Sequence, residues 1–553
     1  MILDLTSDGK LSISQTKRMN EIEPLVRSEY DEYIGALGEL NELKHIDWLL
    51  ETSCRNTFAS KLHERICKLA LLQDLIDRNQ YIDEVKVDDL YMKQVIMLLF
   101  LKNDYECLIT VFSDGKLKYL IPLYNLIVTI YLCFNEWLWA KLIPTKKQPE
   151  GKIIAIENFL FLSSFDKNLN MIDRNYPGFF DHCSDDIKKN IWFLSVLNGI
   201  KHPIDWYHIL RKINLTDSQI LIKENYLVLK DYFIAIYQSI VIPRKIRKYP
   251  KWRNIDISSL IYDEVRDEIF SHSLVSSILY YRFFRRLRDT GIEIDLLIDW
   301  HENQTIDRAL NIGMKQYFPL TKVKGYQGFV VSDVYSSLTP TIYERDNGLL
   351  PDEILVISNQ LLENRKKYCS DFNISLAPAF RYMEAINHKQ IKSGTKKIIL
   401  VALPMLHREA RQVLDLVLSA KFNDAYRILV KKHPTVIKQE LLDEVPQARD
   451  SRLIFTEKKL TKLMDESTLF ITMTSSAAIE AILCEVYVAI IANRRGITAN
   501  PIGNIVDPNY WRLCYTPNCI DDALNYSMNN SILNASSYLV PLESETFNEF
   551  LKF

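Results

Sequence analysis

Glycine, proline and cysteine are all scarce in this sequence of 553 residues, which contains 15, 19 and 9 of them, respectively. So few glycines and prolines exclude a collagen-like chain and a low-complexity disordered chain. The cysteines are dispersed and form no Cys-x-x-Cys pair, which excludes a disulfide scaffold and a zinc-finger spacing. Scattered cysteines are typical of reduced thiols, and the first residues lack the pattern of a signal peptide, so we expect a cytoplasmic protein.

An excess of one charge is also missing. The chain has 68 Lys and Arg residues against 70 Asp and Glu residues, so we expect no nucleic-acid partner. The patterns Gly-x-Gly-x-x-Gly, Gly-x-x-x-x-Gly-Lys-Ser/Thr, His-Glu-x-x-His and Gly-x-Ser-x-Gly are absent, which disfavours dinucleotide oxidoreductases, P-loop NTPases, zincins and α/β-hydrolases. No Asp-x-Asp pair follows a predicted strand, so we expect no metal and no other cofactor.

The composition itself is that of an average globular protein, with 48% hydrophobic and 25% charged residues. At about 100–200 residues per domain, the length predicts two to four domains. Residues 1–150 form a helix-rich part, in which apolar residues recur at helical spacing over residues 37–76. Residues 81–87 are typical of a short strand.

Residues 151–386 alternate compact apolar runs with amphipathic stretches, and residues 398–553 do the same. This alternation predicts parallel strands covered by helices, and therefore an α/β protein with two Rossmann-like domains that face a ligand cleft. The polar segment 387–397 has little to bury, so we interpret it as the linker between the domains. Residues 1–150 would then be a helix-rich elaboration of the first domain.

One segment, residues 119–139, is nearly uncharged and about as long as the shortest spans that cross a bilayer. Pro122 and Glu136 interrupt it, so we favour a buried helix over a helix at a membrane surface, and a transmembrane span is disfavoured. Two basic clusters, at residues 244–253 and 282–288, also contain aromatic residues. We interpret them as solvated helix faces, with contact to the cytoplasmic face of an inner membrane as the alternative.

The first candidate binding feature is the string Lys431-Lys432-His433-Pro434, directly after the predicted strand 426–431. The carboxyl end of a parallel strand faces the crevice in which open α/β sheets bind ligands. Pro434 ends the strand, and His433 with Lys431 beside it suits an oxyanion or a phosphate. Taken alone, the string is equally compatible with an exposed surface turn.

The second feature starts at Thr474, where Ser475 and Ser476 follow the predicted strand 468–473 and open a helix that contains Glu480. Two hydroxyls beside free backbone N–H groups, at the positive end of a helix dipole, make a suitable phosphate site, although a plain serine cap is the simpler explanation. Two phosphate-suited strand ends in one domain are better explained by a nucleotide than by coincidence.

The catalytic candidates follow the predicted strand 293–300. Glu302 would stand at the carboxyl end of that strand and face the crevice, as a nucleophile or as a general base. We expect Asp307 on the next helix to support it. His301 is a candidate acid or base or a packed histidine at the rim, and a helix cap is the alternative role of Glu302.

His433-Pro434 and the Ser475-Ser476 helix start resemble the C-terminal half of GT-B glycosyltransferases that use CMP-activated sugars, such as sialyl-, polysialyl- and Kdo-type transferases. From about residue 36 to 510 the chain also resembles bacterial surface-carbohydrate biosynthesis proteins. This second resemblance rests on the strings Glu302-Asn303-Gln304, Gly325-Tyr326-Gln327, Pro351-Asp352-Glu353-Ile354-Leu355 and Ala379-Phe380-Arg381-Tyr382.

The resemblance implies a GT-B fold and an enzyme that moves an ulosonic acid (Kdo or a sialic-acid-like sugar) from a CMP-sugar donor to a bacterial surface glycan. The acceptor would be a glycan or lipid-linked molecule of the lipopolysaccharide, O-antigen or capsule. The resemblance implies that His433, Ser475 and Ser476 hold the CMP phosphate. We add as neighbouring binding candidates Lys431, Pro434, Thr474, Glu480 and Gln327.

Two alternatives remain open at this point. One is a polyol-phosphate transferase of the CDP-glycerol type, in which an acidic residue usually follows the serines, whereas Ala477 and Ala478 follow them here. The other is a non-catalytic GT-B-like scaffold in a glycan assembly complex.

Overall fold

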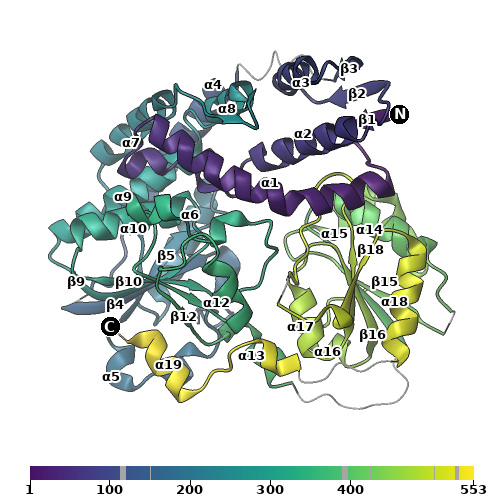
Figure 1. Ribbon diagram of the computed structural model, residues 1–553. Coiled ribbons are helices and arrows are strands. Elements are labelled where there is room, and N and C mark those ends of the chain that lie inside the picture. Colours follow the sequence, from purple (N-terminus) through teal and green to yellow (C-terminus); the bar gives the residue numbers. More distant parts are fainter. Residues whose placement is uncertain are drawn as a thin grey trace.

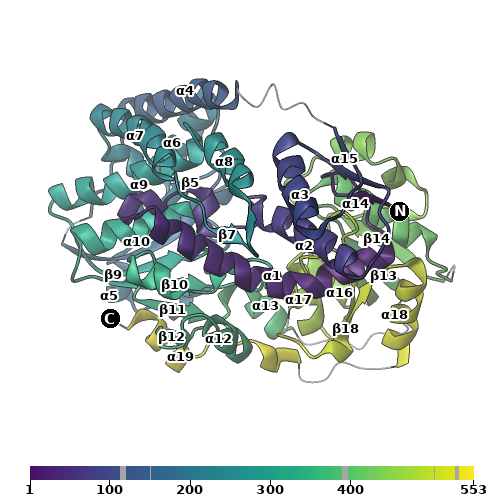
Figure 2. The same cartoon turned by 45° about the horizontal axis from the view of Figure 1, so that its top comes forward.

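The computed structural model describes residues 1–112, 120–149, 151–388, 397–423, 425–503, 505–529 and 535–552. Figure 1 shows two halves, each built around a sheet that lies among helices. The long helix α1 (Ile13–Leu40) runs across both halves. The turned view in Figure 2 shows the same course of α1.

The first half contains a sheet of seven parallel strands in the order β12-β11-β10-β9-β4-β5-β6. The strands are β4 (Lys152–Leu160), β5 (Ile191–Leu197), β6 (Ile220–Leu221), β9 (Glu293–Trp300), β10 (Lys322–Gln327), β11 (Glu353–Val356) and β12 (Ile374–Leu376). The chain builds outward from β4 to β6 and then returns to the other side of β4 with β9. This reversal gives the Rossmann strand order, and the strand ends beside it open onto a crevice.

The helices of the first half connect these strands. They are α5 (Asp185–Lys188), α6 (Pro203–Leu215), α7 (Leu229–Val241), α8 (Ser258–Asp267), α9 (His272–Asp289), α10 (Thr305–Tyr317), α11 (Ile342–Asp346), α12 (Asn359–Arg365) and α13 (Met383–Ile386). A two-stranded hairpin, β7 (Lys251–Trp252) and β8 (Ile255–Asp256), lies before α8.

The basic cluster on α9 is a solvated face only in part, because Arg285 and Arg288 are exposed whereas Arg282 is buried and Arg286 is half-buried. Phe283 is buried, and Arg282 Nη2 lies 2.5 Å from Asp231 Oδ1 of α7. Arg286 Nε lies 2.8 Å from the other oxygen of the same carboxylate. The cations therefore hold α7 against α9, because a buried carboxylate needs paired charges.

The second half contains six parallel strands in the order β15-β14-β13-β16-β17-β18. They are β13 (Ile398–Ala402), β14 (Arg427–Lys431), β15 (Leu453–Phe455), β16 (Ser467–Thr472), β17 (Tyr487–Ile491) and β18 (Trp511–Cys514). The intervening helices are α14 (His407–Ser419), α15 (Lys438–Glu444), α16 (Leu460–Met464), α17 (Ala477–Leu483) and α18 (Pro517–Asn529).

In chain order this second sheet reads 3-2-1-4-5-6, which is again the Rossmann order. The two sheets together confirm the predicted fold class, an α/β protein of GT-B architecture with two Rossmann-like domains. Of the predicted linker 387–397, residues 389–396 lie outside the described residues.

The last helix, α19 (Ser544–Leu551), crosses back to the first domain, although our predicted boundary assigned residues 398–553 to the second. Phe547 and Phe550 on α19 pack against the rings of Phe179 and Phe380. Lys324 Nζ on β10 donates a hydrogen bond to the carbonyl of Glu549 at 2.8 Å. Burial of two phenylalanine rings explains this return, because each ring removes a large apolar area from water.

The N-terminal part is helix-rich, as predicted. It contains α1, α2 (Leu62–Asp77), α3 (Leu90–Asn103), α4 (Ile121–Leu142) and a third parallel sheet of β1 (Ile2–Asp4), β2 (Glu84–Val87) and β3 (Leu108–Val111). The helical pattern over residues 37–76 is interrupted between α1 and α2, where His45 and Arg55 adopt positive φ angles.

This part also touches the second domain, which the sequence did not predict. The N–H group of Leu11 donates to the carbonyl of Arg494 at 2.8 Å, and the Arg494 guanidinium donates to the carbonyl of Leu11. Asn20 Nδ2 donates to Thr498 Oγ1 at 3.0 Å. Residues 1–150 are therefore a brace between the domains as well as an elaboration of the first.

Candidate functional site

A cavity of about 350 Å³ lies between the two domains. Its walls come from the segments after β9, β10, β12, β13, β14 and β16 and from the N-terminal part. They are formed by Asn56, Phe58, Glu302, Gln304, Phe329, Val330, Val331, Tyr335, Ser337, Leu338, Arg381, Pro404, Met405, His433, Thr474, Ser475 and Ser476. The structure thus brings together five of the residues that the sequence singled out, from both domains.

Glu302 stands just beyond the end of β9, in a turn that Asp307 on α10 holds in place. Asp307 Oδ2 accepts hydrogen bonds from the backbone N–H groups of Glu302 and Gln304, both at 2.9 Å. Glu302 Oε1 accepts a hydrogen bond from Trp300 Nε1 at 3.0 Å, and its Oε2 accepts one from the Gln304 amide. Burial raises the pKa of Glu302, while the hydrogen bonds from Trp300 and Gln304 oppose that shift. A carboxylate with a raised pKa at a cavity wall is suited to take a proton from a hydroxyl.

His301 is buried beneath this turn and does not line the cavity, so it does not lie at the rim. Its Nδ1 lies 2.9 Å from Asp299 Oδ2. Burial lowers the pKa of His301 to about 4, so the ring is neutral at physiological pH. The contact with Asp299 orients the ring, and no substrate that is confined to the cavity can touch it.

His433 lies at the cavity wall with one ring nitrogen already occupied. Thr435 Oγ1 lies 2.7 Å from His433 Nδ1, and the Thr435 N–H group donates to the same atom at 3.3 Å. Burial lowers the pKa of His433, and the neighbouring Lys432 adds to the shift. A neutral ring that accepts at Nδ1 carries its proton on Nε2, which leaves Nε2–H as a donor for a ligand.

The hydroxyls of the second feature come directly after β16 and line the same cavity. Ser475 Oγ accepts a hydrogen bond from the N–H group of Ala477 at 3.3 Å. Ser476 occupies the N-cap position of α17, but its side chain makes no capping hydrogen bond. A helix-capping role therefore accounts for at most the Ser475 hydroxyl, and the Ser476 hydroxyl remains available to a ligand.

The other predicted binding residues do not line this cavity. Lys431 Nζ donates instead to the carbonyl of Lys458 at 2.8 Å, and Pro434 is exposed beyond the strand end. Gln327 is buried, where it donates to the carbonyl of Leu338. Glu480 lies on α17 behind the serines, and burial raises its pKa. Of these four residues, Gln327 is the one whose hydrogen bond reaches a described residue of the cavity wall, Leu338.

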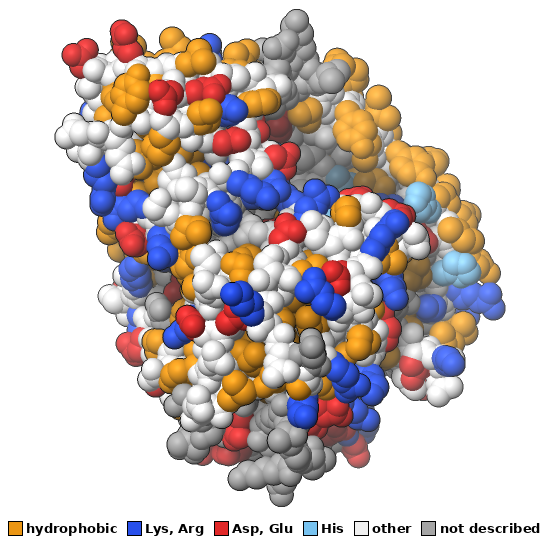
Figure 3. Space-filling view, turned by 90° about the vertical axis from the view of Figure 1, so that its right-hand side faces the viewer, with side chains coloured by type: hydrophobic (Ala, Val, Ile, Leu, Met, Phe, Trp, Pro, Cys, Tyr) orange, Lys and Arg blue, Asp and Glu red, His pale blue; other side chains and the backbone are white. Residues whose placement is uncertain are grey.

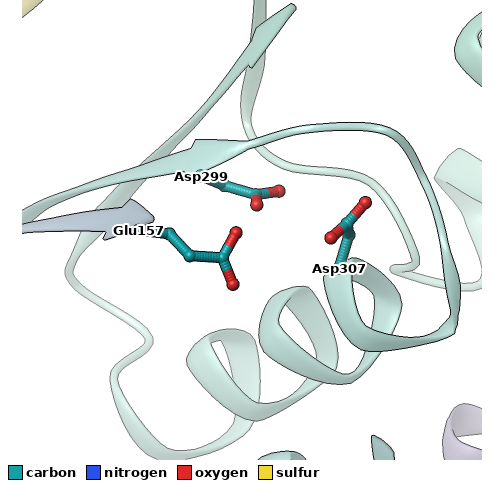
Figure 4. A group of neighbouring side chains, drawn as sticks. All are labelled: Glu157, Asp299 and Asp307. Atoms are coloured by element: carbon teal, nitrogen blue, oxygen red, sulfur yellow. The ribbon is translucent and has the colours of Figure 1, made fainter. Parts of the chain in front are cut away.

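Three carboxyl groups lie behind the Glu302 turn, with one oxygen of each within 4.8 Å of the others (Figure 4). They belong to Glu157 on β4, Asp299 on β9 and Asp307 on α10, and all are buried. Burial raises the pKa of each group, and neighbouring carboxylates raise it further. Like charges this close cannot all ionise in a buried site, so the cluster holds protons at neutral pH.

The same cluster is the group of described residues that could hold a metal ion. One oxygen of each carboxyl group is engaged, by Tyr280, by His301 or by the backbone of the Glu302 turn, respectively. Glu157 Oε2 and Asp299 Oδ1 accept no hydrogen bond from the described residues. A proton shared among these carboxyl groups would use those two oxygens and reduce the charge of the buried cluster.

We expect Glu157→Gln to stabilise the protein more at pH 8 than at pH 5. Because the folded-state pKa of Glu157 is raised, the native protein binds more protons than the unfolded chain above about pH 4. The free energy of unfolding therefore falls as the pH rises, by about 1.4 kcal/mol per pH unit for one proton. The glutamine removes this loss. Denaturant unfolding of both proteins at the two pH values measures the difference.

Asp186→Asn is the matched control, because the Asp186 side chain is 96% exposed. It should shift stability equally at both pH values. An equal effect of Glu157→Gln at pH 5 and pH 8 would contradict a protonated cluster.

A second cavity, of about 490 Å³, adjoins the first within the first domain. Four residues line both cavities, namely Glu302, Gln304, Phe329 and Arg381. The remaining walls combine aromatic and polar side chains: Asn158, Phe159, Phe161, Ile172, Asp173, Arg174, Asn175, Asn198 and Trp300. Aromatic walls with a few fixed polar groups are typical of pockets for small polar ligands.

The carboxylate of Asp173, which lines this second cavity, has one oxygen that can accept a further hydrogen bond. Its Oδ1 accepts hydrogen bonds from the N–H groups of Asn175 and Tyr176, at 2.8 and 3.2 Å. Its Oδ2 is shielded from solvent and accepts no hydrogen bond from the part of the chain that the structure describes. Burial raises the pKa of Asp173 to about 6. A ligand hydroxyl that donates to Oδ2 would satisfy this oxygen.

Sequence reasoning missed several cavity residues. Arg381 was noted only within a motif string, yet it is the cation that lines both cavities. Asn56 and Phe58 reach the cavity from the N-terminal part, and the Phe58 ring stacks on Tyr335 at 4.1 Å. No sequence signal near residues 56–58 pointed to them, because their neighbours in the cavity are far away in the chain.

No family model and no curated protein sequence matches this chain. Among solved structures, the lipopolysaccharide outer core galactosyltransferase WaaB shares 13% identity with a TM-score of 0.36, over 72% of this chain and 94% of that one. The S. aureus protein MnaA with UDP shares 11% identity with a TM-score of 0.40, over 73% and 95%. A putative UDP-N-acetylglucosamine 2-epimerase from Listeria monocytogenes shares 11% identity with a TM-score of 0.37, over 72% and 95%. Similarities this distant do not assign an activity to this chain. The GT-B assignment rests on the strand orders of the two sheets.

Proposed function

We propose that this protein is a glycosyltransferase of the cytoplasm, which moves an ulosonic acid (Kdo or a sialic-acid-like sugar) from a CMP-sugar donor to a bacterial surface glycan. The observation that carries the proposal is the position of Glu302 on the wall that separates two cavities. A carboxylate between a donor site and an acceptor site can act in glycosyl transfer as a general base or as a nucleophile. One cavity lies between the domains, and the other lies within the first domain.

The cavity between the domains suits the donor. His433 offers Nε2–H, residues 474–476 offer hydroxyls, and Arg381 offers a guanidinium. Among the described residues of its walls, Glu302 is the only carboxylate. A phosphate that leaves as CMP would therefore meet donors and one cation, which stabilise the developing charge. The assignment to CMP rests on the resemblance of the His433-Pro434 and Ser475-Ser476 motifs.

In the transfer, the acceptor oxygen forms a bond to the anomeric carbon, and the bond from that carbon to the phosphate oxygen breaks. The electron pair of the broken bond leaves with CMP. In a single displacement Glu302 takes the proton of the acceptor hydroxyl, a role that suits its raised pKa. In a double displacement Glu302 attacks the carbon first, and the acceptor oxygen then replaces it.

We expect CMP to raise the melting temperature more than UDP or GDP does, because the cavity suits a single phosphate. A ligand at 100 times its Kd adds about 2.7 kcal/mol to stability. His433→Ala should lose about 1.5–3 kcal/mol of CMP binding, the contribution of a hydrogen bond to a charged group. Thermal shift with CMP, CDP, UDP and GDP measures both effects.

His407→Ala is the control for this series, because His407 begins α14 and does not line the cavity. It should leave the CMP response unchanged. A larger shift with UDP than with CMP would overturn the donor assignment while leaving the cavity in place.

Glu302→Gln should lower the transfer rate by orders of magnitude and leave CMP affinity nearly unchanged. The amide keeps the shape of the side chain but can neither take a proton nor attack carbon, so the loss falls on the transition state. Transfer assays with CMP-Kdo and CMP-sialic acid measure the rate. A sugar adduct on the peptide that contains Glu302, detected by mass spectrometry, would distinguish double from single displacement.

Glu293→Gln is the matched control, because Glu293 is exposed at the opposite end of the same strand. Full activity of Glu302→Gln would place the chemistry elsewhere. Binding of CMP without any transfer by the wild-type protein would favour a scaffold.

Asp173→Asn should raise the acceptor KM about tenfold, because one buried hydrogen bond contributes about 1.5 kcal/mol. The KM for the donor should not change, since Asp173 lines the second cavity alone. Steady-state kinetics with each substrate varied in turn separates the two constants. Asp166→Asn, in an exposed turn, is the control. An effect on the donor KM alone would remove the second cavity from the acceptor site.

A further inference from the structure

Helix α4 lies on the surface of the first domain, but it buries polar side chains and exposes apolar ones. Among the described residues it is the one helix that is long and apolar enough to cross a membrane. Its fully buried residues include Thr129, Asn135 and Glu136, while Tyr124 and Ile127 are 67% and 62% exposed. Our expectation of a buried helix was therefore wrong. A soluble domain gains stability by the opposite arrangement, with apolar groups inside.

The exposed apolar residues of α4 form one stripe. They recur every three or four positions, which places them on one side of the helix. They are Leu123, Tyr124, Ile127, Ile130, Tyr131, Phe134 and Leu142. At about 1.5 Å per residue, the stripe from Leu123 to Leu142 extends over about 29 Å. Figure 3 shows hydrophobic side chains gathered along the upper right-hand edge of the molecule.

The inner side of α4 is fastened to the first domain by polar contacts. Asn125 Nδ2 donates to the carbonyl of Asp267 at 2.9 Å, and Thr129 Oγ1 donates to the carbonyl of Phe270 at 2.9 Å. Glu136 Oε1 lies 2.6 Å from Lys223 Nζ in a buried ion pair. These bonds hold α4 along the surface of the folded domain, so it cannot span a bilayer without breaking them.

Helix α7 extends the apolar surface. Its exposed residues Leu229, Phe233 and Tyr237 are four positions apart, which again makes one stripe. Tyr232 on α7 donates a hydrogen bond to Glu136 on α4 at 3.0 Å. Figures 1 and 2 both show the two helices at the same corner of the molecule. The α4 and α7 stripes together form a surface that we call the docking face.

The exposed charges on α4 and α7 themselves have one sign. Lys141 on α4 and Lys230 on α7 are exposed, whereas the acidic residues of these helices, Glu136 and Asp231, are buried in ion pairs. Exposed Arg244, Arg247 and Lys248 follow the end of α7. An apolar surface with tyrosines and a positively charged border matches the interface of a bilayer that contains anionic lipid.

We propose that the docking face binds the surface of a phospholipid bilayer that carries anionic headgroups, with α4 lying in the interfacial plane. The apolar stripes enter the boundary between headgroups and acyl chains, and the tyrosine hydroxyls remain at the headgroup level. The lysines and arginines pair with lipid phosphates. The inference goes beyond the proposed glycosyl transfer and does not depend on it.

Flotation of the full chain with vesicles tests the proposal. Wild-type protein should bind vesicles of phosphatidylethanolamine and phosphatidylglycerol, and it should bind less to phosphatidylcholine alone. The triple variant Leu123→Ser, Ile127→Ser and Phe134→Ser should lose about tenfold or more of its partitioning into vesicles. Lys141→Glu with Lys230→Glu should weaken binding to the anionic vesicles, as should high salt, and should leave the weak binding to phosphatidylcholine unchanged.

Matched controls are Leu320→Ser with Ile437→Ser, two exposed apolar residues away from the docking face, and Lys462→Glu on α16. These variants should bind vesicles as the wild type does. Circular dichroism verifies that each variant is folded, and a triple variant that does not fold is replaced by Ile127→Ser alone. Absence of wild-type binding, or equal binding by a folded variant, overturns the proposal. A wild-type dimer that the triple variant converts to monomer, without vesicle binding, would assign the face to a second copy of the chain.

Discussion

The contact of Glu344 with two buried arginines holds the walls of the candidate site. Glu344 Oε2 accepts a hydrogen bond from Arg55 at 2.7 Å, and its Oε1 accepts one from Arg308 at 2.5 Å. Burial alone would raise the pKa of Glu344, but the two guanidinium groups hold that pKa below its usual range. Arg55 also donates to Asp31 on α1 at 2.8 Å, so the N-terminal part joins the same network.

This network positions the turn that carries Glu302. Asn303 has a φ angle of 54°, and its side chain bonds to both Glu344 and Arg308. Arg55 donates to the carbonyls of Ser336 and Thr339, which border the cavity wall at residues 337 and 338. Removing one partner of a buried ion pair lowers the free energy of unfolding by about 3–5 kcal/mol, because the other charge stays buried without a partner. Here that loss would fall on the residues around Glu302, so the geometry of the candidate site and the packing of the N-terminal part depend on the same charges.

The fold was predictable wherever a strand reads as one apolar run. Strands such as β13 and β16 are buried on both faces, so their residues cannot alternate with polar ones, and the sequence shows them directly. The turns at their ends were predictable for the same reason, and Glu302, His433 and residues 474–476 do meet at one cavity. Lys431 shows the limit of this reasoning. A lysine side chain is long and flexible, and the Lys431 amine donates to the carbonyl of Lys458 instead of lining the cavity.

The features that the sequence did not predict depend on contacts between distant parts of the chain. Glu157 stands in the apolar run of β4, and only the pairing of β4 with β9 brings it to Asp299. The return of α19 depends on a site for two phenylalanine rings, which Phe179 and Phe380 form from distant parts of the chain. The exposed side of α4 was missed because hydrophobicity along the chain does not say which face of a helix a domain will cover. Its polar residues, read as interruptions, are the residues that hold it in place.

The N-terminal part connects the docking face to the chemistry. One continuous hydrophobic core joins residues of α1, α2 and α3 to the first sheet and to α9, and it includes Cys133 of α4. The second cavity lies in the domain that contains this core, whereas the core of α14 and α18 is confined to the second domain. A bilayer bound through α4 would thus fix the orientation of the proposed acceptor cavity. The donor-side strand ends would be held in register through the contact of Leu11 with Arg494. On this arrangement a lipid-linked acceptor would approach the half of the protein that lies at the membrane, and a water-soluble donor would reach the cavity from the other half.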